Sequence, residues 1–147
     1  MVNKLKLSIN TERDGLCFGC GKDNPIGLKL HFIWEGETVR AEITPSKIYQ
    51  GWPGVVHGGI INCMLDEAMS HAAHFAGMNC LTAKMEVLFR QPARVEENLI
   101  ITARITRNTR KIIQTEACVT SNDGTLIAKG TGTQYVIEKV PGETGNV

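Results

Sequence analysis

Two carboxylates, Asp66 and Glu67, are neighbours within the most apolar segment of the sequence. A carboxylate is costly to bury without a partner, so the residues around each acid decide what chemistry it can do. On a helix, residues three or four positions apart share a face, which groups Asp66 with Asn62 and Ser70. An amide and a hydroxyl can hold a carboxylate ionised, ready to act as a base or a nucleophile. Asp66 is therefore the candidate catalytic carboxylate.

Glu67 points about 100° away from Asp66 and shares its face with His71 and His74. These three residues have the spacing of metal ligands, which makes a metal site on the helix one hypothesis. The other hypothesis is that they hydrogen-bond at the helix surface or at a subunit contact, Glu67 with His71 as an i,i+4 pair. Because no fourth ligand is evident, we favour the second hypothesis and predict no metal.

The triplet His57-Gly58-Gly59 begins the same segment. The first N–H groups of a helix have no partner within it, and they lie at the positive end of the helix dipole. Glycine lets a substrate carbonyl approach closely, so these amides could hold a developing oxyanion. However, Gly58 and Asp66 are roughly 12 Å apart along a helix, too far to act on one carbon. Two antiparallel helices across a two-fold axis could join Gly58 of one protomer to Asp66 of the other.

The rest of the sequence predicts the elements that position these groups. Apolar residues cover nearly the whole circumference from Gly59 to Ala76, which predicts one long buried helix ending at Gly77. Alternation predicts two strands before the helix and four after it, at residues 28–34, 39–43, 81–89, 98–108, 111–121 and 125–137. We expect one α+β domain, residues 1–147, in which a curved antiparallel sheet of about five or six strands wraps the helix. Its exposed strand edges predict pairing with a second copy.

Composition and charge narrow the class of partner. The formal net charge of +1 argues against broad electrostatic binding to nucleic acid or to an anionic membrane. No apolar run approaches the roughly 20 residues of a membrane span, and the first ten residues lack the apolar core of a signal peptide. The five cysteines are an odd number, which suits free thiols in a reducing compartment. We expect a cytoplasmic protein.

His57-Gly58-Gly59, the buried helix, and Asp66 nine positions after the histidine resemble the hotdog-fold thioesterase superfamily, in the branch of phenylacetate-pathway and 4-hydroxybenzoyl-CoA thioesterases. The segments KMEVLFRQPAR and DGTLIAKGTGTQYV resemble the family's strand after the helix and its last hairpin. The resemblance covers residues 27–136. It implies hydrolysis of an acyl-CoA to the free acid and CoA by a homodimer, or by two dimers paired into a tetramer, without a metal or an organic cofactor.

The resemblance also implies the role of each catalytic residue. The backbone N–H of Gly58 would polarise the thioester carbonyl, Gly59 would help bind the substrate, and His57 would shape the pocket around the carbonyl. Asp66 of the facing subunit would attack the carbonyl carbon as a nucleophile or activate a water molecule.

Further residues are expected to bind substrate. Family members often carry Asn or Gln six positions before the histidine, where this chain has Gly51, and Gln50 is the nearest substitute. Ser70 matches a hydroxyl that some members place beside the carboxylate, and Asn62 lies on the same face. Arg90, in the family's post-helix strand motif, is the best candidate to contact a phosphate of CoA.

Two other functions remain open from the sequence. Hotdog domains also serve as acyl-CoA sensors, and an intact HGG sequence would hold a thioester without cleaving it. A hydratase would need an Asp and a His close together on the loop and helix, whereas Asp66 and His71 are spaced wrongly for one face. Asp66 with its polar neighbours favours catalysis, and the lack of a DNA-binding extension disfavours a regulator.

Cys17 and Cys20 form a CxxC sequence. A structural zinc site would need two more ligands, and neither a second CxxC nor an HxxxH accompanies it. A redox pair would need a different fold context. Residues 1–26 resemble an N-terminal extension that caps the site entrance in some hotdog relatives, so a cap with free thiols is favoured over a metal or redox role. Residues 138–147 are expected to fray.

Overall fold

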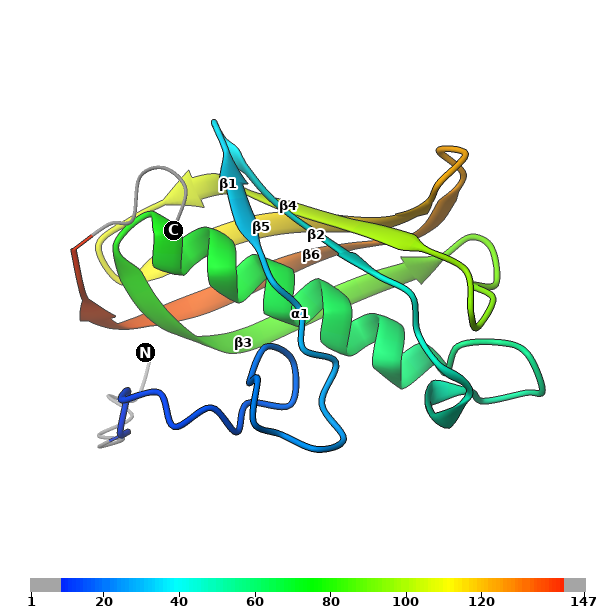
Figure 1. Cartoon of the computed structure of the whole chain (residues 1–147). Helices are drawn as coiled ribbons and strands as arrows, with labels where there is room; N and C mark the ends of the chain where they lie inside the picture. Colours follow the sequence, from blue (N-terminus) through cyan, green and yellow to red (C-terminus); the bar gives the residue numbers. More distant parts are fainter. Residues whose placement is uncertain (1–8, 142–147) are drawn as a thin grey trace.

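In the computed structural model, which describes residues 9–141, one long helix lies along one face of a curved sheet (Figure 1). The elements are β1 (Ile33–Glu35), β2 (Thr38–Ile43), the 3-10 helix η1 (Lys47–Tyr49), α1 (Gly58–Phe75), β3 (Met78–Phe89), β4 (Leu99–Asn108), β5 (Ile112–Ser121) and β6 (Leu126–Lys139). The six strands form one antiparallel sheet in the order β1-β2-β4-β5-β6-β3. The predicted α+β architecture and its long central helix are confirmed.

Helix α1 buries one face rather than its whole circumference. The buried face is apolar and consists of Ile61, Met64, Leu65, Ala68, Met69, Ala72, Ala73 and Phe75. The other face is half-buried and carries Asn62, Cys63, Asp66, Glu67, Ser70, His71 and His74. The long buried helix is as predicted, but its apolar surface is narrower than the predicted near-whole circumference, because the polar residues gather on one half-buried side while the apolar side packs on the sheet.

The predicted strand over residues 28–34 is only partly correct. Leu28 and Leu30 are buried, as the alternation predicts, but the strand itself begins at Ile33. The N–H groups of Leu28 and Leu30 donate to the carbonyl groups of Phe18 and Gly19, at 2.8 and 2.9 Å, instead of to a strand. The buried side chains of Leu28 and Leu30 and the hydrogen bonds of their N–H groups therefore hold the CxxC loop against the core.

Strand β3 forms one edge of the sheet and pairs, within residues 9–141, with β6 alone. It is 12 residues long, and its pairing is interrupted by a register shift between Thr82 and Lys84. A long edge strand presents unpaired N–H and C=O groups that can template another strand. The sheet therefore ends in a surface suited to strand pairing.

The C-terminal part of the described chain is more ordered than expected. Residues 138 and 139, which we expected to fray, belong to β6, and the N–H of Val140 donates to the carbonyl of Gly77 at 2.8 Å. The remainder of the expected tail, residues 142–147, lies outside the described residues. In the part of the chain that is described, no helix is both long enough and apolar enough to cross a membrane.

Gln134, on β6, is fully buried, and neither Nε2 nor Oε1 has a hydrogen-bond partner among the described residues. An unpaired buried amide costs about 1–3 kcal/mol. We therefore expect Gln134→Met, which keeps a similar volume, to raise the free energy of unfolding in urea by about 1–2 kcal/mol. Gln114→Met, at an exposed position on β5, is the matched control and should change it little. A loss of stability in Gln134→Met would mean that the amide has a partner.

Candidate active site

The N-terminal end of α1 borders a cavity of about 730 Å³. This volume is within the range of small-molecule sites, about 300–1,000 Å³. The walls come from the loop before α1, the first turn of α1, the end of β3 and the segment that follows β3. They include Trp52, His57, Gly58, Phe89, Arg90 and Ile127. Three of the residues predicted from the sequence therefore share one cavity.

His57 caps the N-terminus of α1, with φ −58° and ψ 136°. Its Nδ1 accepts a hydrogen bond from the N–H of Gly59 at 2.8 Å, which places the proton of a neutral imidazole on Nε2. The N–H groups of Ile60 and Ile61 donate to the carbonyl of His57, at 2.9 and 3.1 Å. In this first turn, the N–H of Gly58 has no acceptor among residues 9–141. The Gly58 amide is thus available to a ligand in the cavity, whereas the Gly59 amide is used by the cap.

The loop before the helix uses Gln50 for its own structure. The Oε1 of Gln50 accepts a hydrogen bond from the N–H of Gly54 at 3.1 Å, and Gln50 is not among the cavity residues. Gly51 does line the cavity, and a Cβ built there would lie 3.5 Å from Cα and Cδ2 of His57. The position that faces His57, where family members often have Asn or Gln, therefore carries no side chain in this chain.

Asp66 lies outside this cavity, on the half-buried face of α1. Its Oδ1 accepts a hydrogen bond from Oγ1 of Thr82, on the edge strand β3, at 2.5 Å. Ser70 is half-buried on the same side of the helix and borders a smaller cavity of about 220 Å³. The single chain does not bring Asp66 to the Gly58 amide, as the helix geometry predicts. Asn62 lies between them and is also half-buried.

Sequence reasoning did not identify Thr82 as a partner of Asp66. The two residues are 16 positions apart. A hydroxyl residue in an alternating strand does not reveal which helix residue its side chain will contact. The adjacent register shift decides which β3 side chains turn toward α1, and nothing in the sequence marks its position.

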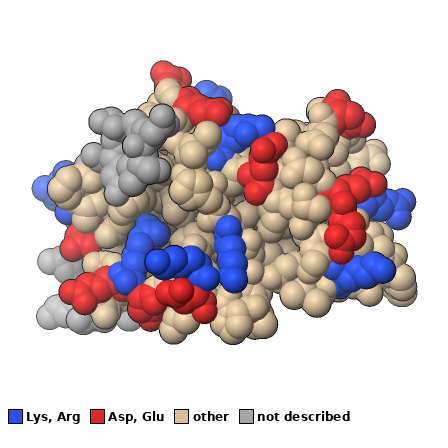
Figure 2. Space-filling view, viewed as in Figure 1, with Lys and Arg blue, Asp and Glu red and all other residues tan. Residues whose placement is uncertain are grey.

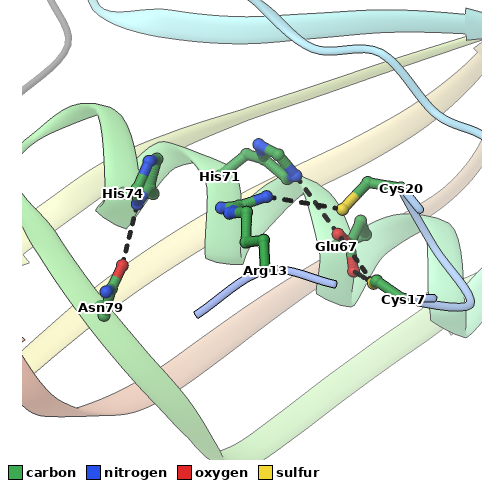
Figure 3. Close-up of polar contacts among 7 residues, drawn as sticks. All are labelled: Arg13, Cys17, Cys20, Glu67, His71, His74 and Asn79. Atoms are coloured by element: carbon green, nitrogen blue, oxygen red, sulfur yellow. Dashed lines mark hydrogen bonds and ion pairs between the residues drawn. The ribbon is translucent and has the colours of Figure 1, made fainter. Parts of the chain in front are cut away.

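Glu67 faces the N-terminal loop (Figure 3). Its Oε1 lies 3.2 Å from Nε2 of His71, which confirms the predicted i,i+4 pair. The thiol of Cys17 donates to the same carboxylate, with Sγ 3.6 Å from Oε1 and 3.8 Å from Oε2. His74 turns away, with Nδ1 2.8 Å from Oδ1 of Asn79. The metal site considered from Glu67, His71 and His74 is therefore not assembled.

The environment of Glu67 favours its ionised form. Burial raises the pKa of this carboxyl, but hydrogen bonds from His71, Cys20 and Cys17 lower it by more, so the pKa lies below its ordinary value. Burial and the neighbouring negative charge of Glu67 raise the pKa of the Cys20 thiol well above its usual range. All five cysteines are free. The N-terminal loop covers this face of α1 and does not line the cavity at Gly58.

Much of the face of the molecule in Figure 2 is uncharged; a small group of Lys and Arg side chains at the lower left is bordered by acidic side chains, and the other charged side chains are scattered. This distribution matches the formal net charge of +1. Arg90 is exposed and lines the cavity.

Solved structures share this fold at low sequence identity. A Streptococcus mutans protein bound to acetyl CoA matches with a TM-score of 0.72 and 20% identity, over 76% of this chain and 90% of that protein. A hypothetical thioesterase of Streptococcus pneumoniae with coenzyme A matches at 0.72 and 15%, over 76% and 88%. The Escherichia coli PaaI protein of the phenylacetic acid degradation operon matches at 0.72 and 17%, over 77% and 83%. No curated protein matches the sequence.

The family is shown by the sequence itself. The model of the thioesterase superfamily matches residues 53–128, more than half of the 147-residue chain. This match spans the loop before α1, all of α1, and the strands from β3 to the start of β6. The chain therefore belongs to the thioesterase superfamily and has its hotdog fold.

Proposed function

We propose that the protein hydrolyses an acyl-CoA thioester to the free acid and CoA, at a site shared by two protomers. The observation that carries this proposal is the Gly58 amide, which opens into a ligand-sized cavity without an acceptor among the described residues. The CoA-bound neighbours support the same ligand class. The expected cytoplasmic location and the lack of nucleic-acid and membrane partners stay predictions.

The first turn of α1 would stabilise the charge that develops on the substrate. The thioester oxygen accepts a hydrogen bond from the N–H of Gly58, and the positive end of the helix dipole favours the oxyanion of the tetrahedral intermediate. His57 lines the same cavity, and a neutral ring would carry its proton on Nε2, since Nδ1 accepts the hydrogen bond from Gly59. Arg90 would pair with a phosphate of CoA at the rim of the cavity. These groups bind and polarise the substrate, but they supply no base.

Asp66 of the partner subunit would supply the missing group. Its carboxylate either attacks the carbonyl carbon or removes a proton from the attacking water, and both routes pass through the oxyanion that Gly58 holds. The intermediate then collapses, the C–S bond breaks and CoA leaves as a thiolate that takes up a proton. On the water route this step yields the free acid directly. On the nucleophilic route it leaves a mixed anhydride on Asp66, which a water molecule then hydrolyses to release the acid and restore the carboxylate. The hydrogen bond from Thr82 would orient the Asp66 carboxylate, and its second oxygen, which has no hydrogen-bond partner among residues 9–141, would be available to react.

Pairing of two β3 edges would bring the two halves together. β3 runs back along α1, so that Thr82 contacts Asp66 while Phe89 lies beside Gly58, 3.6 Å from a Cβ built there. In an antiparallel β3–β3 pair with Thr82 opposite Phe89 of the second copy, Asp66 of one subunit approaches Gly58 of the other. The same contact would cover Leu88 and Phe89, which are 55% and 52% exposed. We therefore propose a homodimer, with a tetramer as a further stage of assembly.

A thiol-release assay tests the activity directly. We expect the protein to release CoA from at least one member of a panel of short, medium, branched and aromatic acyl-CoAs, with one free acid formed per CoA. The Asp66→Asn variant, purified in parallel, measures any contaminating hydrolase. Tight binding of an acyl-CoA without cleavage by the unaltered protein would contradict the proposal and support the acyl-CoA sensor.

A further inference from the structure

We propose that Cys17, Cys20 and Glu67 form a binding site for a thiophilic divalent cation, zinc above all, that ties the N-terminal loop to α1. One ligand atom from each of the three residues lies within 4.8 Å of the other two (Figure 3). Ligand atoms around one tetrahedral zinc are about 3.3–3.8 Å apart, given Zn–O near 2.0 Å and Zn–S near 2.3 Å. The donors thus need only a small contraction to coordinate one ion.

The backbone of the loop holds these donors in place. The N–H of Gly21 donates to the carbonyl of Cys17 at 2.9 Å, which closes a tight turn around the CxxC sequence. Gly19 is buried, and a Cβ added there would lie 2.5 Å from Oε2 of Glu67. A larger residue here would require the Glu67 side chain or the loop to shift, so the glycine permits this close approach. The bond from Leu30 to Gly19 fixes the loop from the other side.

Groups around the three donors suit a bound cation. His71 contacts Oε1 of Glu67 at 3.2 Å and is stacked on Phe32, with ring centroids 4.7 Å apart. A histidine that hydrogen-bonds a ligating carboxylate fixes its orientation, as outer-shell partners of metal ligands do. Arg13 lies on the other side, with Nη1 3.7 Å from Sγ of Cys20.

The charges balance when a divalent cation is bound. Binding would displace the protons of the Cys17 and Cys20 thiols to solvent. The two thiolates formed and the Glu67 carboxylate would then carry three negative charges, and a divalent ion with the Arg13 guanidinium would supply three positive charges. Thiolate ligands select zinc and similar soft or borderline ions over magnesium and calcium. Three protein ligands leave a fourth position for water. Because none of these ligands lines the cavity at Gly58, the ion would act on the anchoring of the loop and not on the thioester.

Cobalt titration of the full-length, reduced and chelator-treated protein tests the site. We expect one equivalent of Co²⁺ to give a thiolate-to-cobalt charge-transfer band and the visible bands of tetrahedral cobalt, and Zn²⁺ to displace it. Zn²⁺ should also raise the melting temperature, since a ligand of the folded state stabilises it. Cys17→Ser and Cys20→Ser should each weaken the charge-transfer band and the affinity. Cys118→Ser, a cysteine on β5, is the matched control and should retain both.

Two further variants test the same site without changing a cysteine, in case a cysteine variant does not fold. Glu67→Gln should weaken cobalt binding, and His71→Phe, which keeps the ring stack but loses the bond to Glu67, should weaken it about 10- to 100-fold. The proposal is overturned if the unaltered protein shows no tetrahedral cobalt bands. It is also overturned if Cys118→Ser loses binding as much as Cys17→Ser, or if the Cys17 and Cys20 thiols form a disulfide under reducing conditions and exclude the metal.

Discussion

Gly58→Pro is expected to lower kcat for acyl-CoA hydrolysis by about 10²- to 10³-fold, because it removes the amide proton assigned to the oxyanion. The helix should survive this change. Gly58 is the first residue of α1, a position where proline is favoured because its missing N–H has no partner in the helix. His57 has ψ 136°, within the range preferred before proline, and the space at Cβ is an ordinary contact with Phe89.

Gly58→Ala is the matched control for this prediction. It places a Cβ in the same space and keeps the N–H, so the ratio of kcat between the two variants reports the replacement of the amide proton by the proline ring carbon. Circular dichroism should show the same helix content in both. Equal kcat in the proline and alanine variants would contradict the role assigned to the Gly58 amide.

Asp66→Asn is expected to lower kcat by about 10²- to 10⁴-fold, the range for loss of a general base. The asparagine side chain has nearly the same shape and can still pair with the hydroxyl of Thr82, so the change removes charge and basicity with little effect on packing. Glu37→Gln removes an exposed carboxylate in the β1–β2 turn and serves as the control. Loss of activity in Glu67→Gln with retention of activity in Asp66→Asn would show that the catalytic carboxylate is Glu67 and not Asp66.

Mixing the two defective proteins tests whether the site is shared between subunits. After dissociation and reassociation of Gly58→Pro and Asp66→Asn in equal amounts, half of the dimers contain one copy of each. In such a dimer one site combines an intact Gly58 with an intact Asp66, so about one quarter of the original activity should return. A site built within one chain would recover none.

Much of the architecture could be predicted because it follows from short-range periodicity. The helix was predicted at Gly59–Ala76 and is observed at Gly58–Phe75, and the four strands after it match to within a few residues. The strand predicted at 28–34 failed for a different reason. Alternation reports which side chains are buried, but it does not say which carbonyl each N–H will meet, and Leu28 and Leu30 meet the CxxC loop.

The sequence alone determined the helix, its HGG start and the separation of Gly58 from Asp66, since these depend on spacing along one helix. Only the tertiary structure decided three contacts: Thr82 hydrogen-bonds Asp66, Gln50 hydrogen-bonds within its own loop, and the CxxC thiols lie beside Glu67. From the sequence, the CxxC thiols and the Glu67 face were two weak metal candidates, each short of ligands. The two candidates form one cluster because buried Leu28 and Leu30 hold the CxxC loop against α1. The residues that meet there are some 40 to 50 positions apart, and no local sequence pattern encodes such a contact.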